Sequence, residues 1–230
     1  MHKEKKPRFN LLFDRTRPGA FTQVFILKDR SLLVSHLCEE ERAQFDQFLS
    51  PFVGGFHRVP DDPEPPSRAF KKLIEAQMYF GKSIQQNEHV IAIVGSPGGW
   101  THIAKMRVAH VTSVDRSTLE KSLMDHERVS FHMGDAFKYQ TNKKVDWALS
   151  DVIAHPQRVI KLMENWPQKR ACRYFIFTVK FQGKPDYSTL ERLKRKAAQV
   201  CEVFYLTQLN SNKNEATIMG KSLMTGEPHE

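Results

Sequence analysis

Cysteine is scarce in this chain of 230 residues, which has only Cys38, Cys172 and Cys201 and no C-x-x-C pair. An odd number of isolated thiols argues against a disulfide framework and against a cysteine zinc site. The ten histidines are scattered without an H-x-x-x-H pair, so no metal ion is expected. These absences favour a reducing, cytoplasmic compartment.

Long apolar runs are also missing. None approaches the roughly 20 residues that a membrane helix needs, so no membrane partner is expected. The N-terminus is charged and lacks the apolar stretch of a secretory signal. Hydrophobic residues nevertheless make up 40% of the chain, which excludes a disordered polar chain and is typical of a folded protein.

Negative charge is in deficit. The chain has 26 aspartate and glutamate residues against 35 lysine and arginine residues, a net charge of +9 at pH 7. A surface this basic favours a polyanionic partner such as nucleic acid. A generically basic soluble protein is the alternative interpretation.

The clearest break in the chain is the segment 59–66, which has four prolines and three acids. It can form neither a helix nor a central strand, so it is predicted to be a linker or a rigid loop. Residues 1–60 then form a small basic N-terminal segment, short for an independent domain, and residues 61–230 form the main domain. The segment is predicted to contain strands at 21–27 and 31–37 and a helix at 39–49.

Strand and helix patterns alternate after the linker. Such alternation predicts an α/β, Rossmann-like fold with a mostly parallel sheet covered on both faces. The last two strands are predicted to form a hairpin that adds one antiparallel strand. The expected strands are 90–94, 111–114, 129–131, 145–149, 174–179, 203–209 and 216–219, and the expected helices are 67–80, 98–106, 118–125, 156–166 and 187–200.

A glycine-containing turn follows the first buried strand and opens a helix. Glycine lets the backbone approach a ligand closely, and a helix N-terminus offers free N–H groups. The turn is not G-x-G-x-x-G and its proline lacks an N–H, so a nucleoside without a pyrophosphate is expected rather than a dinucleotide. The residues concerned are Gly95, Ser96, Pro97, Gly98, Gly99 and Trp100.

Two acids end the next two strands. Asp115 lies 20 residues after Gly95, where a Rossmann-like fold places an acid on a ribose diol, and Asp135 could accept from an adenine amino group. Ligands of open α/β sheets bind at the carboxyl ends of the strands, as this placement requires. An ordinary strand–helix turn with two capping acids is the alternative.

Four further charged residues lie at or near the ends of predicted strands or in the helix that precedes them. Asp151 and Lys180 each follow a strand, Glu215 begins the last strand, and Lys72 lies in the helix before the sheet. A lysine directly after an apolar run is costly unless it is paired. Taken one at a time, each is also explained as a solvated charge at the end of an element.

Their order along the chain resembles a known family. Ser67-Arg68-x-x-x-Lys72, then Pro97-Gly98-Gly99-Trp100-Thr101, then Asp151, Lys180 and Glu215-Ala216-Thr217 are similar to the FtsJ/RrmJ family of S-adenosylmethionine-dependent RNA ribose 2′-O-methyltransferases. Ser122-Leu123-Met124-Asp125 and Trp147 extend the likeness to the RlmM type, which methylates a cytidine ribose of large-subunit ribosomal RNA. The resemblance covers about residues 60 to 220.

The resemblance implies a function and a site. It implies a class I methyltransferase fold with a seven-stranded sheet, S-adenosylmethionine as cofactor with S-adenosylhomocysteine as product, no metal, and ribosomal RNA as partner. It implies a catalytic set of Lys72, Asp151, Lys180 and Glu215, with the cofactor held by Gly95 to Trp100, Asp115, Asp135 and Asp151. The RlmM type carries a longer N-terminal region with an RNA-binding THUMP domain, so the target RNA stays open.

The resemblance also assigns Lys180 as the base that takes the ribose proton. In one version the carboxylates orient the lysines while Lys72 and desolvation favour a neutral Lys180. In the other, Lys180 stays charged and only positions the ribose. RNA phosphates are expected to contact a set of basic residues, comprising Lys3, Lys5, Lys6, Arg8, Arg15, Arg17, Arg68, Lys71 and Lys184.

Two other functions remain as alternatives. One is a catalytically inactive, methyltransferase-like factor that binds RNA during ribosome assembly, although such a protein has no physical need for two lysines beside two acids. The other is a methyltransferase of proteins or small molecules. The net charge and the segment Asp151-Val152-Ile153-Ala154, which lacks an Asn/Asp-Pro-Pro-Tyr-type motif, both disfavour it.

Overall fold

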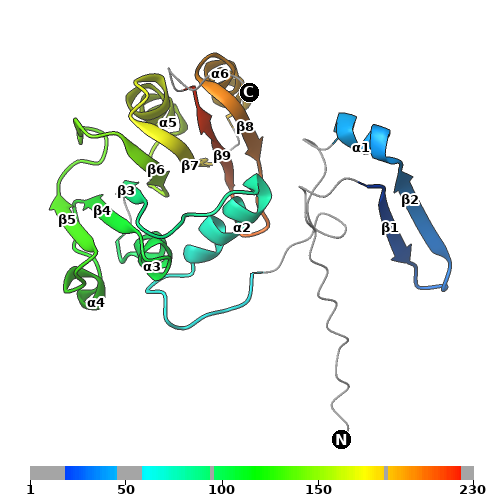
Figure 1. Cartoon of the computed structure of the whole chain (residues 1–230), viewed down its shortest axis with the longest axis horizontal. Coiled ribbons are helices and arrows are strands. Elements are labelled where there is room, and N and C mark those ends of the chain that lie inside the picture. Colours follow the sequence, from blue (N-terminus) through cyan, green and yellow to red (C-terminus); the bar gives the residue numbers. More distant parts are fainter. Residues whose placement is uncertain (1–18, 46–58, 94–95, 184–185, 224–230) are drawn as a thin grey trace, which may run out of the picture. The chain divides into compact units, whose positions relative to one another are not determined.

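The computed structural model describes residues 19–45, 59–93, 96–183 and 186–223. The chain divides into two compact units, Met1–His57 and Arg58–Glu230 (Figure 1). The described part of the smaller unit contains β1 (Phe21–Ile26), β2 (Leu32–Leu37) and α1 (Glu39–Phe45).

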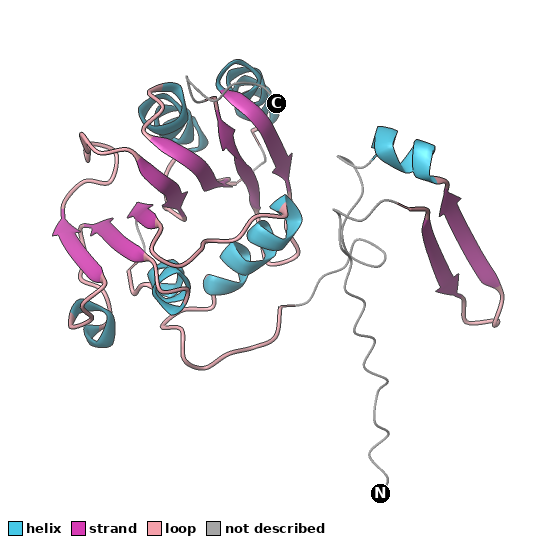
Figure 2. Ribbon diagram, viewed as in Figure 1, coloured by secondary structure: helices cyan, strands magenta, loops and turns pink. Residues whose placement is uncertain are grey.

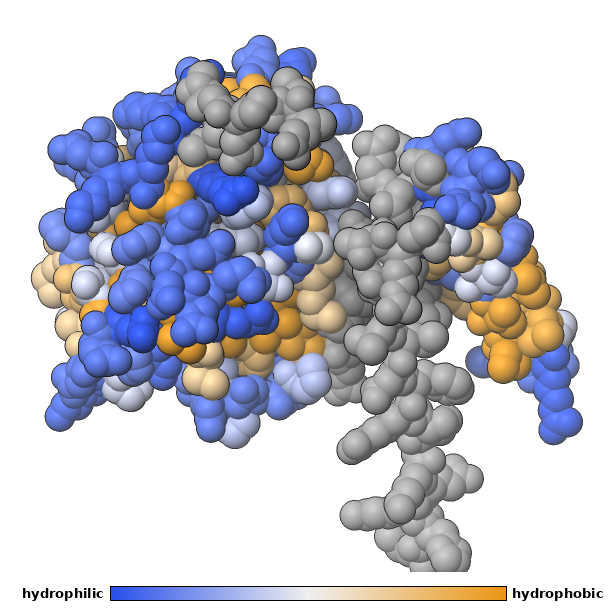
Figure 3. All heavy atoms as spheres, in the orientation of Figure 1, coloured by the Kyte–Doolittle hydropathy of each residue, from blue (hydrophilic) through white to orange (hydrophobic). Residues whose placement is uncertain are grey.

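The smaller unit is built around an antiparallel hairpin. The two strands pair from Phe21 opposite Leu37 to Ile26 opposite Leu32. Large apolar side chains lie at its surface, and Figure 3 shows them gathered along the hairpin. A two-stranded hairpin alone is at best marginally stable in water. The exposed apolar side chains of this hairpin are Val24, Phe25, Ile26, Leu27, Leu32, Leu33 and Val34.

The larger unit holds a seven-stranded sheet with the order β5-β4-β3-β6-β7-β9-β8. The first five strands in sequence run parallel, and β9 pairs antiparallel with both β7 and β8. The predicted α/β fold with a mostly parallel seven-stranded sheet is therefore confirmed. The strands are β3 (His89–Ile93), β4 (His110–Asp115), β5 (Val129–Met133), β6 (Val145–Ser150), β7 (Cys172–Lys180), β8 (Cys201–Thr207) and β9 (Glu215–Ser222).

Helices cover both faces of this sheet (Figure 2). Alternate residues of β7 show why, because successive side chains of a strand point to opposite faces. Phe175 and Phe177 pack with helices α5 and α6, whereas Tyr174 and Ile176 pack with α2 and α3. The helices are α2 (Phe70–Phe80), α3 (Gly99–Met106), α4 (Lys121–Met124), α5 (Pro156–Met163) and α6 (Tyr187–Val200).

One predicted helix is only partly α-helical. Residues 156–166 were expected to be a single helix, but α5 ends at Met163 and a π-helical turn, Glu164–Gln168, follows it. Pro167 lies inside that turn, and a proline removes a backbone donor from regular helical bonding. The turn brings Trp166 into the core, where it is 2% exposed.

The three thiols are free, and two of them are buried. Burial raises the pKa of the Cys172 thiol and of the Cys201 thiol to about 12, so both stay protonated at pH 8. Because the thiolate is the nucleophile, we expect only Cys38 to react promptly with a thiol reagent at pH 8. A count of modified thiols, one in the native chain and three in denaturant, checks this expectation. Prompt modification of two or three native thiols would contradict it.

Candidate functional site

The topology brings four charged side chains to one end of the sheet. Asp151 directly follows β6, Lys180 ends β7 and Glu215 begins β9, and these three strands are neighbours. Lys180 and Glu215 are direct partners in the antiparallel β7–β9 register. Lys72 reaches the same place from α2. We call these four residues the tetrad.

The tetrad is a network of close ionic contacts. Nζ of Lys72 lies 3.1 Å from Oδ1 of Asp151 and 2.6 Å from Oε2 of Glu215. Nζ of Lys180 donates to the backbone carbonyl of Asp151 at 2.7 Å and lies 3.2 Å from its Oδ1. The four side chains are only 12 to 16% exposed, so water screens these contacts far less than at a surface.

Thr178 is a further member of the site that the sequence analysis missed. Its hydroxyl donates to Oδ1 of Asp151 at 2.8 Å, and its side chain is fully buried. Thr178 precedes Lys180 by two residues, so the two side chains lie on the same face of β7. Thr178 is the only serine or threonine of β7, and this was the available signal.

Glu75 holds the helix that carries Lys72 against the loop that leads to Glu215. It is 2% exposed, and its two carboxylate oxygens accept the backbone N–H groups of Asn210 at 2.6 Å and Ser211 at 2.8 Å. In the same loop, the side chain of Asn212 donates to the hydroxyl of Thr217 at 3.0 Å. Glu75, a buried acid three residues after Lys72 on the same face of the helix, therefore fixes the position of the loop that leads into β9.

The glycine-containing turn packs directly against the start of α2. A β-carbon on Gly99 would collide with Oγ of Ser67 and lie 3.0 Å from the backbone oxygen of that residue, so the position favours glycine. Trp100 is 2% exposed, and its indole N–H donates to the carbonyl of Ala69 at 2.8 Å. These two residues of the expected cofactor site thus fasten α3 to α2 from within the core.

Asp115 holds the other side of that turn. Its Oδ2 accepts the backbone N–H of Ser96 at 2.8 Å and its Oδ1 accepts that of Ser117 at 3.0 Å. A carboxylate has about four acceptor positions, more than the two that these contacts use. Gly98 adopts φ +116°, a conformation that favours glycine, while Gly95 lies outside the described residues.

Asp135 lies with Asp115 in the lining of one cavity of about 230 Å³. The backbone N–H of Phe137, and then the guanidinium of Arg116 at 2.6 Å, hold the pKa of the Asp135 carboxyl below its ordinary value. It is therefore an ionised acceptor at neutral pH. Phe137 and Val152 supply apolar lining, with the guanidinium of Arg158 3.8 Å from the centre of the Phe137 ring.

This cavity fits a nucleoside. Two carboxylates from the ends of neighbouring strands suit a ribose diol and an exocyclic amine, and the apolar lining suits a base. It lies at the carboxyl ends of β4 and β5, beside the β3–β6 switch point, where open α/β sheets bind ligands. In the described ranges, no cluster of three or more histidine, cysteine, aspartate or glutamate side chains could hold a metal ion.

Two of the basic residues expected to contact RNA are already paired. Nζ of Lys71 lies 2.6 Å and the guanidinium of Arg68 lies 3.5 Å from Oδ1 of Asp61. Lys71 therefore contacts the proline-rich segment, whereas Lys72 enters the tetrad. The other candidates, Lys3, Lys5, Lys6, Arg8, Arg15, Arg17 and Lys184, lie outside the described residues. Among the helices the structure describes, none is long and apolar enough to span a membrane.

Comparisons with known proteins identify the family of this chain. A model of the family described as "FtsJ-like methyltransferase" matches residues 65–218. The chain is 32% identical over 173 residues to "Ribosomal RNA large subunit methyltransferase M" of Psychromonas ingrahamii, a match that covers 70% of this chain and 47% of that protein. The protein of the same name from Yersinia pestis is 29% identical over 194 residues, covering 78% and 52%.

The chain thus spans about half the length of these curated relatives. Among solved structures, a candidate hemolysin from Lactococcus lactis superposes with a TM-score of 0.54 at 16% identity, over 69% of this chain and 88% of that one. At that identity the likeness shows the fold alone. The family resemblance predicted from the ordered sequence blocks is confirmed.

Proposed function

The chain belongs to the FtsJ-like methyltransferase family, and from this we propose that it uses S-adenosylmethionine to methylate a ribose 2′-hydroxyl of ribosomal RNA. The observation that carries the proposal is the tetrad itself, with two lysines and two carboxylates held together from four separate elements. The relatives' printed names supply the substrate class. The net charge of +9 suits a polyanionic substrate.

The cofactor's place in this proposal is the cavity between Asp115 and Asp135. Asp115 would accept from its ribose diol, Asp135 from its adenine amine, and Phe137 would pack against the base. When bound, the cofactor supplies a methyl group on a sulfonium, which is a good electrophile. The protein's own task is then to place the ribose oxygen in line with that methyl group and to manage its proton.

In this proposal Lys180 meets the ribose hydroxyl. Two of the three N–H directions of its ammonium are directed at Asp151, one to the backbone carbonyl and one to Oδ1. The third direction is left for substrate. A neutral amine in this position donates to the same two oxygens and offers its lone pair to the hydroxyl proton, whereas an ammonium donates a third hydrogen bond to the hydroxyl oxygen.

An arginine at position 180 separates these two roles. A guanidinium keeps a charge and its donors but does not lose a proton in proteins. If Lys180 acts as base, Lys180→Arg abolishes methyl transfer while RNA binding stays intact. If Lys180 only positions the ribose, the variant keeps measurable activity, within about 100-fold of wild type.

The direct test is methyl transfer from labelled S-adenosylmethionine to total RNA. Label in a dinucleotide that resists alkaline hydrolysis identifies ribose methylation, and sequencing that position identifies the target. Label in alkali-sensitive nucleotides would contradict the 2′-hydroxyl as acceptor. Cofactor binding with no label in any RNA, including RNA from cells lacking the protein, would favour the inactive RNA-binding alternative.

Asp115→Asn tests the cofactor site separately. The amide keeps the size of the side chain but loses the charge and one acceptor, and a hydrogen bond to a charged group contributes about 1.5–3 kcal/mol. We expect the Kd for S-adenosylmethionine, measured by calorimetry, to rise about 10- to 100-fold. The exposed Asp125→Asn is the matched control and should leave it unchanged. Equal affinity of both variants would remove Asp115 from the cofactor site.

The smaller unit's role belongs to the same proposal. We propose that residues 1–60 are an appendage that binds RNA, supported by their basic side chains. Removing this segment should lower RNA affinity and flatten its salt dependence, while S-adenosylmethionine binds residues 61–230 with unchanged affinity. An unchanged salt dependence would refute this role.

A further inference from the structure

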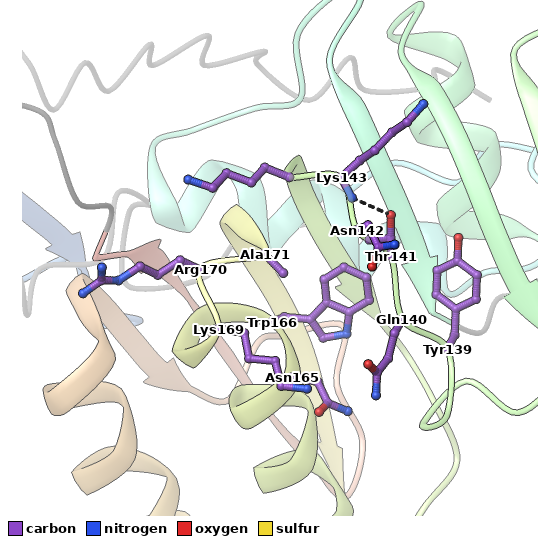
Figure 4. Close-up of a pocket in the computed structure, with 11 residues that line it drawn as sticks. Tyr139, Gln140, Thr141, Asn142, Lys143, Asn165, Trp166, Lys169, Arg170 and Ala171 are labelled. Carbon is purple, nitrogen blue, oxygen red and sulfur yellow. Dashed lines mark hydrogen bonds between the residues drawn. The ribbon is translucent and has the colours of Figure 1, made fainter.

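A second cavity lies at the opposite ends of the strands from the tetrad. It has a volume of about 230 Å³ and is formed by the segments that lead into β6 and β7. The nine residues of β7 separate it from Lys180, a distance of roughly 25 Å at the rise of an extended strand. Figure 4 shows the side chains that line it, among them Trp166, Gln140, Asn165, Lys169 and Arg170.

Trp166 gives this cavity an unused donor. The side chain is 2% exposed, and its indole N–H has no hydrogen-bond partner among the described residues. Figure 4 shows the indole within the cavity lining, with its nitrogen on the side of Gln140. A buried donor without a partner costs about 1–3 kcal/mol, so an acceptor bound here would relieve a real cost. The other two indoles have partners, since Trp100 donates to Ala69 and Trp147 to Glu88.

The rim of the cavity is cationic. Lys143, Lys144, Lys169 and Arg170 all line it, and no carboxylate does. In the described ranges, none of the four lies within ion-pairing distance of an acid, unlike Lys71, Lys72, Lys180 and Lys221. Figure 4 shows the ends of Lys143 and Arg170 extended away from the indole, so the cations give the cavity a positive rim and do not contact the N–H donor. A positive rim and a buried N–H donor together suit an anion.

From this arrangement we propose that the cavity binds a phosphate group of RNA, as a second anchor far from the reacting ribose. The inference rests on the proposed function, because it takes RNA as the polyanion. A phosphodiester offers acceptor oxygens and no donors, which matches a lining whose charged and buried groups are all donors. Free phosphate has the same chemistry, and the experiment separates the two sources.

The three indole N–H groups make the test direct. In a ¹⁵N-labelled full-length chain, each gives one signal in a ¹H–¹⁵N spectrum, and Trp166→Phe identifies the one that belongs to Trp166. Addition of a single-stranded RNA oligonucleotide should shift the Trp166 signal along the RNA-binding curve and leave Trp100 and Trp147 in place. A shift with inorganic phosphate but none with RNA would overturn RNA as the ligand, and no shift with either would overturn the site.

A pair of variants with the same charge change provides the second measurement. Lys169→Gln combined with Arg170→Gln should lower RNA affinity about tenfold and reduce the slope of log K against log salt by about two. Lys194→Gln with Arg195→Gln, on the exposed face of α6, is the control. Equal losses in both pairs would mean general electrostatics and contradict the site. Neither the indole signal nor the RNA affinity depends on methyl transfer. A failure of this inference can therefore be distinguished from a failure of the catalytic proposal.

Discussion

Replacing Lys180 with methionine is expected to lower the single-turnover rate of methyl transfer by about 10³-fold. A positioned acid–base group contributes roughly 10²- to 10⁴-fold, and methionine keeps most of the length of the side chain while removing its charge and its proton chemistry. Asp151 keeps its contacts with Lys72 and Thr178, so the rest of the tetrad stays paired. The measurement is the rate at saturating RNA and S-adenosylmethionine.

The control for this variant is Lys194→Met on the exposed part of α6, which removes the same charge away from the tetrad. It should retain the wild-type rate. The Kd of S-adenosylmethionine should change little in either variant, because Lys180 does not line the cavity of Asp115 and Asp135. A Lys180→Met rate within tenfold of wild type would exclude Lys180 from the chemical step.

Glu75→Gln is expected to lower the free energy of unfolding by about 3 kcal/mol. The glutamine keeps one acceptor oxygen but turns an NH₂ group toward one of the two backbone N–H donors, so a buried donor loses its partner. The loop that leads to Glu215 is then no longer fixed to α2, and the rate of methyl transfer falls with it. Urea unfolding, together with the rate measured well below the unfolding transition, checks both effects.

Glu202→Gln is the matched control for Glu75. Its carboxylate contacts the basic side chain of Lys221 at 2.7 Å and is 35% exposed, so the loss of its charge should cost under about 1 kcal/mol. Glu75→Asp adds a distinct readout, since the shorter acid keeps the charge but cannot reach both N–H groups at once. Equal destabilisation by Glu75→Gln and Glu202→Gln would show that burial of Glu75 has no energetic role.

The sequence predicted the sheet well because its strands are short apolar runs with clear boundaries. Helix α6 was predicted at its observed limits, 187–200, where Asp186 caps its first turn by accepting the N–H of Thr189. The π-helical turn after α5 was not predicted, because it depends on tertiary packing of Trp166 as well as on Pro167. A local sequence pattern does not contain the tertiary contacts on which such packing depends.

The tetrad was predicted through a resemblance, while its supports were not. Thr178 and Glu75 act through contacts that join distant parts of the chain, and a pattern read along the sequence does not contain them. The roles of Gly99 and Trp100 likewise emerge only from the packing of α3 on α2. The catalytic and cofactor roles of the site residues stay predictions that the variants above test.

The antiparallel strand β9 sets the order in which the site can appear during synthesis. The chain is made from its N-terminus, so Lys72 leaves the ribosome early, and Asp151, its partner, follows 79 residues later. Glu215 emerges last, and β9 must then insert between β7 and the already made β8. Contacts of such long range form slowly. A nascent chain that has exposed every helix of the domain therefore still lacks a complete tetrad, and we expect activity to begin only after β9 has entered the sheet.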